Sequence, residues 1–303
     1  MQIIGPEAER HLTWAGLTDA LEAGHARPRA AIGDTLLARG ADRLLSRAAW
    51  IDGMGMLVKS APIMPGNAAR GLPTVNGAVT LFDDATGVLT ALIDFHLVTK
   101  WKTAGDSLLS AKRLARADAR DFLIVGAGTV GRSMIEAYRS HWPDARFTVW
   151  NRTPEGAARL AAEVPGVAIA GDLEAAVRAA DVIATATMAT EPLIRGDWLR
   201  PGQHIDLIGA YTRDMREADD AVLARGSLYV DCRETTIAHI GDLTGPLMRG
   251  VISEADILAD FYDIPEGLYR RRSAEEITVA KNGGGAHLDL MTAVYIRDAV
   301  AAA

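Results

Sequence analysis

The chain has 303 residues, enough for two domains that each bury a core of their own. Hydrophobic residues make up 49% of it and charged residues 23%, and the formal net charge of −7 argues against general binding to nucleic acid or to acidic membranes. The single cysteine, Cys232, excludes an intramolecular disulfide and favours a reducing compartment, which we expect to be the cytoplasm.

We expect no secretory signal, no membrane-spanning segment and no metal site. The N-terminus has no basic region followed by an apolar stretch, and no apolar run reaches the roughly 18 residues of a membrane span. Cys232 ends an apolar run at 227–232, which predicts a buried structural thiol rather than a nucleophile. No cluster of histidines, cysteines and acids has ligand spacing, so we expect no metal.

The first part of the chain predicts helices and hairpins. We expect a helix at 13–26, strands at 55–62, 78–83 and 89–94, and a helix at 103–119. Turn signals at 65–67 and 83–87 favour hairpins over crossovers, which is typical of an α+β domain. A last helix at 287–303 follows the middle of the chain and is expected to pack back on this domain. We therefore assign residues 1–116, with 286–303, to the first domain.

The middle of the chain alternates between short apolar runs and amphipathic, alanine-rich segments. The predicted strands are 122–126, 147–151, 167–170, 181–187, 204–210 and 227–232, and two of the predicted helices are 155–164 and 173–180. This alternation predicts a parallel sheet built from βαβ units and covered on both faces. The expected fold class is α/β, with a Rossmann domain at 117–285 beside the α+β domain.

A glycine-rich loop opens this second domain. Gly126, Gly128 and Gly131 form a GxGxxG motif that follows a predicted strand and begins a predicted helix. The first glycine permits the tight turn, the second lets the backbone approach a pyrophosphate, and the third lets the helix lie close to the strand. With Thr129 and Val130 between them, these residues predict a dinucleotide site at a helix N-terminus.

The residues that follow the second strand of this domain indicate which dinucleotide binds. An acid that bonds the ribose hydroxyls of NAD usually lies about 20 residues past the glycines, and this chain has Asn151 there. Arg152 can pair with a 2′-phosphate, and Thr153 adds a hydroxyl donor. The segment favours NADPH over NADH, although NADH stays possible. The alternative is that Arg152 is a solvated residue at a helix start.

Three cations stand in apolar surroundings of the first domain. Lys59 lies in a predicted strand, Arg47 precedes the hairpins, and Lys102 is placed at a predicted helix start, where a cation opposes the helix dipole. Each alone is also explained as a surface side chain with a buried stem. Together they predict a clamp for a carboxylate.

The sequence resembles the ornithine cyclodeaminase/μ-crystallin family. The similarity runs in order through residues 58–94 and 97–131, then through "WNRT", "MATEP", "LIGAYTRDMREAD" and "VDCRE". The resemblance implies a homodimer in which the first domain binds substrate and forms the dimer interface, and the second is a Rossmann domain. The family includes cyclodeaminases, alanine dehydrogenase-like enzymes, cyclic ketimine reductases and related imine reductases.

The family's substrate-carboxylate residues transfer to this chain one at a time. The lysine of its "VK" segment matches Lys59, the threonine after its "GL" turn matches Thr74, and an arginine before the first hairpin strand corresponds to Arg47. The arginine of its "RTAA" segment falls on Lys102, which keeps the charge but loses the bidentate fork. Thr103 keeps a hydroxyl that lies near the cofactor in relatives.

The most informative departure from the family lies at Tyr211. Ornithine cyclodeaminases have an aspartate there that handles the substrate amine. A tyrosine cannot serve as a carboxylate partner for ornithine's distal ammonium, but it can donate a proton to an imine nitrogen. Tyr211 therefore argues against cyclodeamination, unless it only shapes the pocket.

The remaining cofactor and catalytic assignments also follow from the resemblance. It implies cofactor contacts at Thr187, Met188, Gly209 and Asn282. His287, which follows three glycines at a predicted helix start, is either a proton donor or an ordinary helix residue. The whole set looks most like the branch of the family that reduces cyclic imino acids.

The function we expect is an NAD(P)H-dependent oxidoreductase acting on C=N bonds. It would reduce Δ1-pyrroline-2-carboxylate or Δ1-piperideine-2-carboxylate to L-proline or L-pipecolate. Arg47, Lys59 and Lys102 would hold the carboxylate so that the imine carbon lies over the nicotinamide. The alternatives are an ornithine cyclodeaminase, a reductase of an acyclic imine such as iminosuccinate, with Arg213 as a further cation, and a non-catalytic protein that binds NADPH and a small ligand.

Overall fold

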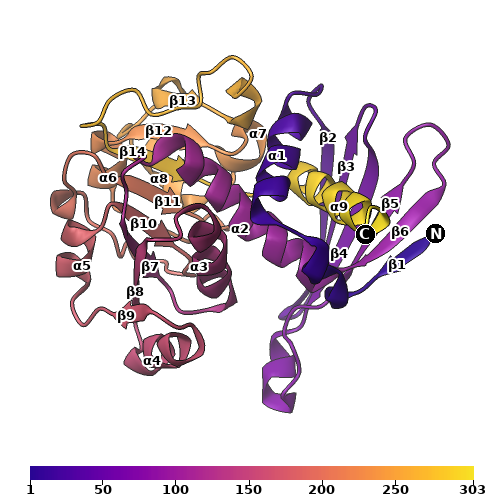
Figure 1. Ribbon diagram of the computed structural model, residues 1–303, viewed down its shortest axis with the longest axis horizontal. Coiled ribbons are helices and arrows are strands. Elements are labelled where there is room, and N and C mark those ends of the chain that lie inside the picture. The colour runs from indigo at the N-terminus through magenta and orange to yellow at the C-terminus, as the bar shows by residue number, and fades with distance from the viewer. The chain divides into compact units, whose positions relative to one another are not determined.

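The computed structural model describes residues 1–303 and divides the chain into two compact units. The first unit comprises Met1–Lys102 and Gly285–Ala303, and the second comprises Thr103–Gly284. Figure 1 shows the chain with its elements labelled. None of its helices combines the length and apolar character needed to cross a membrane.

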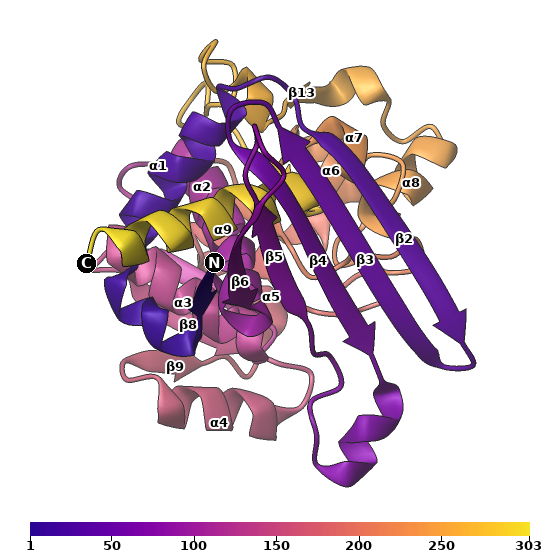
Figure 2. The ribbon, with the colours of Figure 1, turned by 90° about the vertical axis from the view of Figure 1, so that its right-hand side faces the viewer.

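The first unit is a mixed sheet with helices packed on it. Its elements are β1 (Gln2–Ile4), α1 (Trp14–His25), β2 (Ala31–Arg39), β3 (Asp42–Ile51), β4 (Gly55–Ile63), β5 (Ala78–Phe82), β6 (Leu89–Asp94), the start of α2 (Phe95–Leu114), and α9 (Ala286–Ala301). The strand order is β1-β6-β5-β4-β3-β2, antiparallel except for the parallel pair β1–β6. Figure 2 shows α9 running across one face of this sheet. The expected α+β domain is confirmed.

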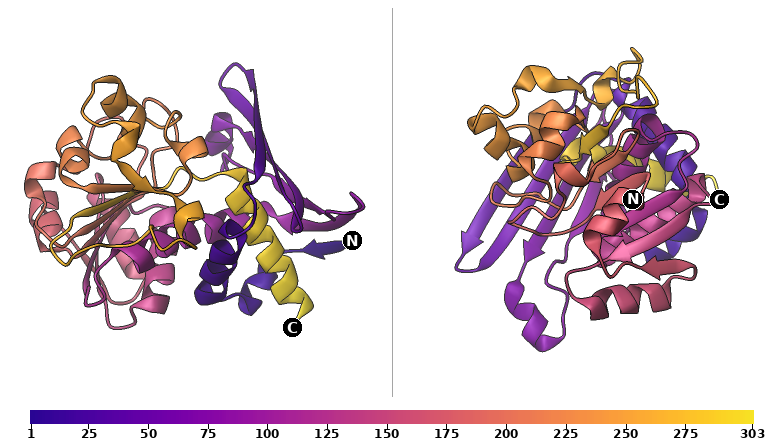
Figure 3. Two further views of the ribbon diagram at one scale, coloured as in Figure 1. Left: turned by 90° about the horizontal axis from the view of Figure 1, so that it is seen from above. Right: turned by 90° about the vertical axis from the view of Figure 1, so that its left-hand side faces the viewer.

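Local sequence explains how α1 and α9 pack together. Thr13 caps α1 by accepting a hydrogen bond from the Gly16 amide, and Leu17 and Leu21 are fully buried. A Cβ at Gly24 would lie 2.5 Å from the sulfur of Met291, so only a glycine lets α1 approach α9 this closely. Both helices lie on the same side of the sheet in Figure 3.

The second unit is built on one parallel sheet. Its elements are β7 (Asp121–Val125), α3 (Thr129–His141), β8 (Arg146–Trp150), α4 (Pro154–Glu163), β9 (Val167–Ile169), α5 (Leu173–Ala179), β10 (Val182–Thr185), β11 (His204–Leu207), α6 (Asp220–Arg225), β12 (Ser227–Val230), α7 (Arg233–Thr236), α8 (Gly241–Met248), β13 (Ile257–Ala259) and β14 (Thr278–Lys281). All six predicted strands are present, and β13 and β14 join them. Every pairing is parallel, which confirms the α/β fold class.

The strand order fixes where a ligand can bind in this unit. The eight strands run β13-β12-β14-β11-β10-β7-β8-β9, so the order reverses between β7 and β10. In open parallel sheets a crevice forms beyond the carboxyl ends of the strands at such a reversal. The glycine loop follows β7 directly, which places it at this point.

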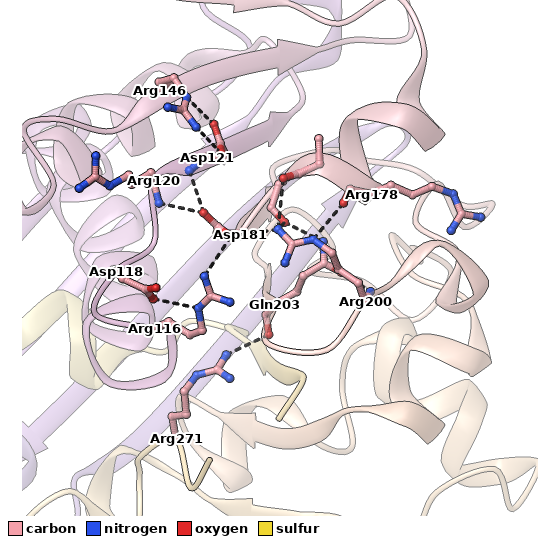
Figure 4. A network of polar contacts seen from close by, with 12 residues as sticks. Arg116, Asp118, Arg120, Asp121, Arg146, Arg178, Asp181, Arg200, Gln203 and Arg271 are labelled. Atoms are coloured by element: carbon pink, nitrogen blue, oxygen red, sulfur yellow. Dashed lines mark hydrogen bonds and ion pairs between the residues drawn. The ribbon is translucent and has the colours of Figure 1, made fainter. Parts of the chain in front are cut away.

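At the amino ends of the strands of this sheet, charged side chains form a network of hydrogen bonds and ion pairs (Figure 4). Asp181 precedes β10 and accepts hydrogen bonds from the Arg120 and Asp121 amides, at 2.9 and 3.1 Å, and from Arg200 at 2.9 Å. Arg146 forms a bidentate pair with Asp121 beside it. These bonds tie the amino ends of β7, β8 and β10 together, and their donors and acceptors satisfy one another.

Two sequence-based positions differ from the structure, and both involve α2. We expected the domain boundary at 116/117, whereas the second unit begins at Thr103, because Ser107 and Ser110 bond to Tyr138 and Tyr269 of that unit. The expectation that Lys102 opens a helix is wrong, since α2 begins at Phe95. Lys102 lies two turns inside the helix, so the helix-dipole argument does not apply to it.

Candidate active site

The glycine loop lines an open cleft of about 550 Å³ in the second unit. Gly126 has φ +112°, and a Cβ on it would lie 2.6 Å from the Ala186 carbonyl oxygen. A Cβ on Gly131 would lie 2.1 Å from the Gly126 oxygen, whereas one on Gly128 would meet nothing within 4 Å. The two outer glycines are therefore needed for the fold, and the middle one leaves space free at the N-terminus of α3.

This space suits a phosphate group. Thr129 and Val130 form the first turn of α3, which contains no acidic residue. The free N–H groups and the dipole of a helix N-terminus favour an anion. The loop therefore fits the pyrophosphate of a dinucleotide, as the sequence predicts.

Asn151 fixes the wall of the cleft next to the loop. Its Oδ1 accepts a hydrogen bond from the Ala127 amide at 3.0 Å, and its Nδ2 donates to the carbonyl and hydroxyl oxygens of Thr153 at 2.9 and 2.8 Å. A carboxylate at this position could not make the two donations. Arg152 is exposed and lines the cleft, and Glu191 lines it as well.

The far wall of the cleft is held by a carboxylate that sequence reasoning gave no role. Glu217 is fully buried and accepts hydrogen bonds from the amide and hydroxyl of Thr187 at 2.7 and 2.8 Å. It also accepts from the amides of Gly209 and Ala210, at 2.7 and 3.2 Å. Thr187 and Met188 both line the cleft, so Glu217 positions residues predicted to contact the cofactor.

A buried lysine balances this carboxylate. Burial raises the pKa of Glu217, and the charge of Lys281 opposes that shift. Lys281 Nζ donates to the Leu207 and Ala210 carbonyls at 3.0 and 2.8 Å and lies 3.3 Å from Asp242 Oδ2. The segment "MREAD" carried the family resemblance, but nothing in its residue pattern indicates that Glu217 turns inward.

The side chain of Asn282, a predicted cofactor contact, bonds to other groups of the protein. Its side chain is buried, donating to Asp206 and accepting from Ser110 Oγ at 3.1 Å. Burial raises the pKa of Asp206 to about 7, while hydrogen bonds from Ser107, Tyr138 and Asn282 favour its charged form. The Asn282 side-chain amide is thus engaged inside the protein, and its backbone N–H donates to the Leu207 carbonyl at 3.0 Å.

In the first unit, the sheet register aligns two cations. Arg47 on β3 lies directly opposite Lys59 on β4, and Asp34 on β2 lies directly opposite Arg47. Directly opposed residues of an antiparallel pair share a face, where like charges destabilise the sheet. Arg47 is bonded to both oxygens of Asp34, at distances of 2.8–3.2 Å. Arg47, Lys59 and the half-buried Lys102 are called the cation cluster below.

Lys59 itself is buried in an ion pair with the C-terminal helix. Its Nζ donates to Asp289 Oδ1 at 2.8 Å and lies 4.8 Å from the centre of the Phe95 ring. Burial lowers the pKa of Lys59, and Asp289 opposes this shift, while Lys102 and Arg47 add to it. The charges of Arg47 and Lys102 therefore act on Lys59, and the three cations belong to one cluster.

The proposed proton donors have contrasting surroundings. Tyr211 follows β11 in the second unit and is 60% exposed, so its side chain is open to solvent. His287 lies in the first turn of α9 and is fully buried, and burial lowers its pKa to about 3. The imidazole is therefore neutral at physiological pH, which makes it a weak acid.

The other predicted residues take simpler positions. Thr74 is exposed, and its carbonyl accepts a hydrogen bond from the Met64 amide at 2.7 Å. Thr103 lies half-buried inside α2. Cys232 is buried, and burial raises the pKa of its thiol, which fits the expected structural thiol.

Comparison with known proteins identifies similar chains. Residues 52–303 match the Ornithine cyclodeaminase/mu-crystallin family. The chain is 50% identical to the Δ1-pyrroline-2-carboxylate reductase of Paracoccus denitrificans, over 96% of this chain and 94% of that protein. The structure of Thermococcus litoralis Δ1-pyrroline-2-carboxylate reductase with NADH and L-proline is similar, with a TM-score of 0.91 and 26% identity over 100% of this chain and 98% of that one. An archaeal alanine dehydrogenase dimer with bound NAD has a TM-score of 0.90 and 26% identity over 100% and 96%.

Proposed function

This chain belongs to the ornithine cyclodeaminase/mu-crystallin family, and we propose that it reduces Δ1-pyrroline-2-carboxylate, or a similar small α-imino acid, with a reduced nicotinamide cofactor. One observation carries the proposal: Arg47 and Lys59 are directly opposed on one face of the sheet. Asp34 and Asp289 offset part of the repulsion within the cation cluster, and a substrate carboxylate would offset the rest. The Paracoccus relative bears the name of this activity.

The cation cluster defines the class of substrate. Asp34 and Asp289 already pair with Arg47 and Lys59, so the cluster has one cation left over, Lys102. This charge balance fits a substrate with one carboxylate better than a dicarboxylate. Held by its carboxylate, the imino acid would keep its C=N bond in a fixed orientation for reduction.

The cleft of the second unit fits the cofactor, which supplies a hydride to the imine carbon when bound. The backbone at Gly128 and the first turn of α3 would hold its pyrophosphate. We infer a preference for NADPH, because Arg152 lines the cleft and Asn151 is bonded in a way that a ribose-binding acid could not reproduce.

The nitrogen of the imine needs a proton as hydride reaches the carbon. We assign this donation to Tyr211, which is exposed, or to water. The neutral, buried His287 would shape the substrate pocket instead. An iminium is a better hydride acceptor than a neutral imine, so the rate should fall as pH rises and the substrate loses its proton.

We further propose a homodimer that forms through the first unit. The edge strand β2 and its neighbour β3 expose Leu36, Leu37, Leu44 and Trp50, at 60%, 60%, 39% and 49%. An unpaired edge strand with exposed leucines tends to associate with another chain. A second copy of the chain would cover it. The single buried cysteine suits a reducing compartment, and we propose the cytoplasm.

The test is oxidation of NADPH, followed by its near-ultraviolet absorbance, with Δ1-pyrroline-2-carboxylate as substrate and NADH in parallel. Turnover that prefers NADPH supports both the substrate and the cofactor. Turnover that prefers NADH keeps the reaction and overturns the role of Arg152. Activity only with pyruvate and ammonia would indicate an alanine dehydrogenase-like enzyme, and ammonia release from ornithine would indicate a cyclodeaminase.

A further inference from the structure

Lys59 and Asp289 form an ion pair that is almost completely removed from water. Lys59 is 6% exposed and Asp289 is 0% exposed, and the two residues lie 230 positions apart in the sequence. Strand β4 supplies the lysine and helix α9 supplies the aspartate. The pair thus joins the C-terminal helix to the centre of the sheet.

The surroundings make this pair expensive for the folded state. Val79, directly opposite Lys59 on β5, is fully buried, and the Phe95 ring lies against the ammonium. The cost of taking two charges out of water often exceeds their attraction, and apolar residues of similar volume are frequently more stable. Stability alone therefore does not explain why the chain keeps this pair.

The hydrogen bonding of Asp289 also gives no structural reason for a buried carboxylate at this position. Its Oδ2 has no hydrogen-bond partner although it is buried, and Thr292 Oγ1, three residues further along α9, has none either. Asp289 caps no helix and ties no loop. The one hydrogen bond of its side chain is accepted from the ammonium of Lys59.

We propose that Asp289 is a positioning residue that holds Lys59 in place and keeps it charged for the substrate carboxylate. The inference rests on the proposed function, because it assigns Lys59 to substrate binding. Asp289 acts through Lys59 and has no contact of its own with the reacting atoms.

The charges that face the pair explain why a counter-ion is needed. Lys59 has Arg47 opposite it on β3 and Lys102 nearby on α2, and both lower its pKa, as burial does. Burial alone would raise the pKa of Asp289, but Lys59, Lys102 and Arg47 hold it below its usual value. The neutral His287 also lies near these charges, with its pKa affected by Asp289, Lys102, Arg47 and Arg29, and its ring packs edge-on against that of the buried His25. Without Asp289, the charges that shift the pKa of Lys59 would all be cations, and its pKa would fall further.

The first experiment is a kinetic cycle with Asp289→Asn, Lys59→Met and the double variant. Asp289→Asn weakens the charged hydrogen bond that holds Lys59, so the KM for the imino acid should rise by about tenfold or more. The same substitution should change kcat and the KM for NADPH by less than about threefold. The increase should grow with pH, as Lys59 loses its proton earlier. In the Lys59→Met background the same substitution should add nothing, because its target is gone. An equal increase in both backgrounds would overturn the proposal.

A second readout does not depend on the substrate. Acetic anhydride acylates only unprotonated amines, so mass spectrometry of the peptide containing Lys59 gives the pH midpoint of its labelling. Asp289→Asn should lower this midpoint by about one pH unit or more, and Asp298→Asn, an exposed aspartate on the same helix, should leave it unchanged. An unchanged midpoint in Asp289→Asn would refute the role of Asp289. If no imine is turned over, the proposed function fails, and this midpoint still decides whether Asp289 controls Lys59.

Discussion

Two glycines of the same loop should respond in opposite ways to alanine. At Gly128 the backbone angles, φ −84° and ψ −174°, suit any residue, and the new Cβ would meet no atom within 4 Å. Gly128→Ala should therefore fold normally and gain about 0.4–1 kcal/mol, because the unfolded chain loses conformational freedom. The added methyl group would occupy the space that the pyrophosphate needs, so we expect NADPH affinity to fall by about tenfold or more.

Gly131→Ala is the matched variant. Its Cβ would lie 2.1 Å from the Gly126 oxygen, where ordinary contact begins at 3.4 Å, so the first turn of α3 must move away from β7. Overpacking of this kind costs about 1–3 kcal/mol. In a chain of this length that corresponds to a Tm lower by about 2–5 °C.

The assay is a thermal melt of each variant combined with a titration of NADPH followed by its fluorescence. The expected pattern is a normal Tm with weak binding for Gly128→Ala, and a lowered Tm for Gly131→Ala. If Gly128→Ala bound NADPH as tightly as the unaltered protein, the loop would not hold the pyrophosphate. A Gly131→Ala protein with an unchanged Tm would contradict the close approach of α3.

Three further predictions follow from single groups. Arg152→Ala should raise the KM for NADPH about tenfold or more and leave that for NADH nearly unchanged; equal effects in parallel assays would rule out a 2′-phosphate contact. The pKa of buried His204 is lowered to about 3, so the native state binds fewer protons than the unfolded chain between about pH 6.5 and 3. Its contribution to stability is complete above that window and is lost as pH falls through it, and denaturant melts of His204→Asn should show a shallower acid dependence. Glutamate at Leu36 and Leu37 should yield a monomer in sedimentation experiments, and a persistent dimer would place the interface elsewhere.

The second unit could be predicted well because its signals are local. Its central strands are short and rich in apolar residues, and β10 and β11 are buried at every position. The glycines at 126, 128 and 131 carry their constraints in their own backbone. Such features need no knowledge of distant residues.

The hairpin of β2 and β3 was missed because it lacks the usual alternation. Residues 31–51 include "LLARGADRLL", and most of β2 is exposed on both faces. Without a buried face, no period of two is imposed on the sequence. The start of α2 was missed although a signal existed: Asp94 accepts a hydrogen bond from the Leu97 amide at 2.7 Å, the pattern of an N-terminal cap.

The roles of Glu217 and Asp289 could not be predicted from sequence. Each is a carboxylate in an ordinary polar setting along the chain, next to Arg216 and close to His287. Their function is set by partners that only the fold brings near: Gly209 and Thr187 for one, and Lys59, on a distant strand, for the other. A buried charge can be recognised in a sequence only when its partner is local.

The positions of the buried charges themselves carry an argument about function. Lysine is among the residues least often buried, yet Lys59 and Lys281 are 6% and 1% exposed, and each faces a buried carboxylate. Removing one partner of such a pair costs about 3–5 kcal/mol, whereas apolar replacement of both is often neutral. Replacement of such a pair by apolar residues during evolution must therefore pass through an unstable protein that carries only one of the two substitutions. The Lys59–Asp289 pair belongs to the cation cluster and the Lys281–Asp242 pair lies by the cofactor cleft, so selection for ligand binding also favours keeping them. Replacing both members of a pair by apolar residues separates the two effects. We expect stability to recover in these double variants, while substrate or cofactor affinity does not.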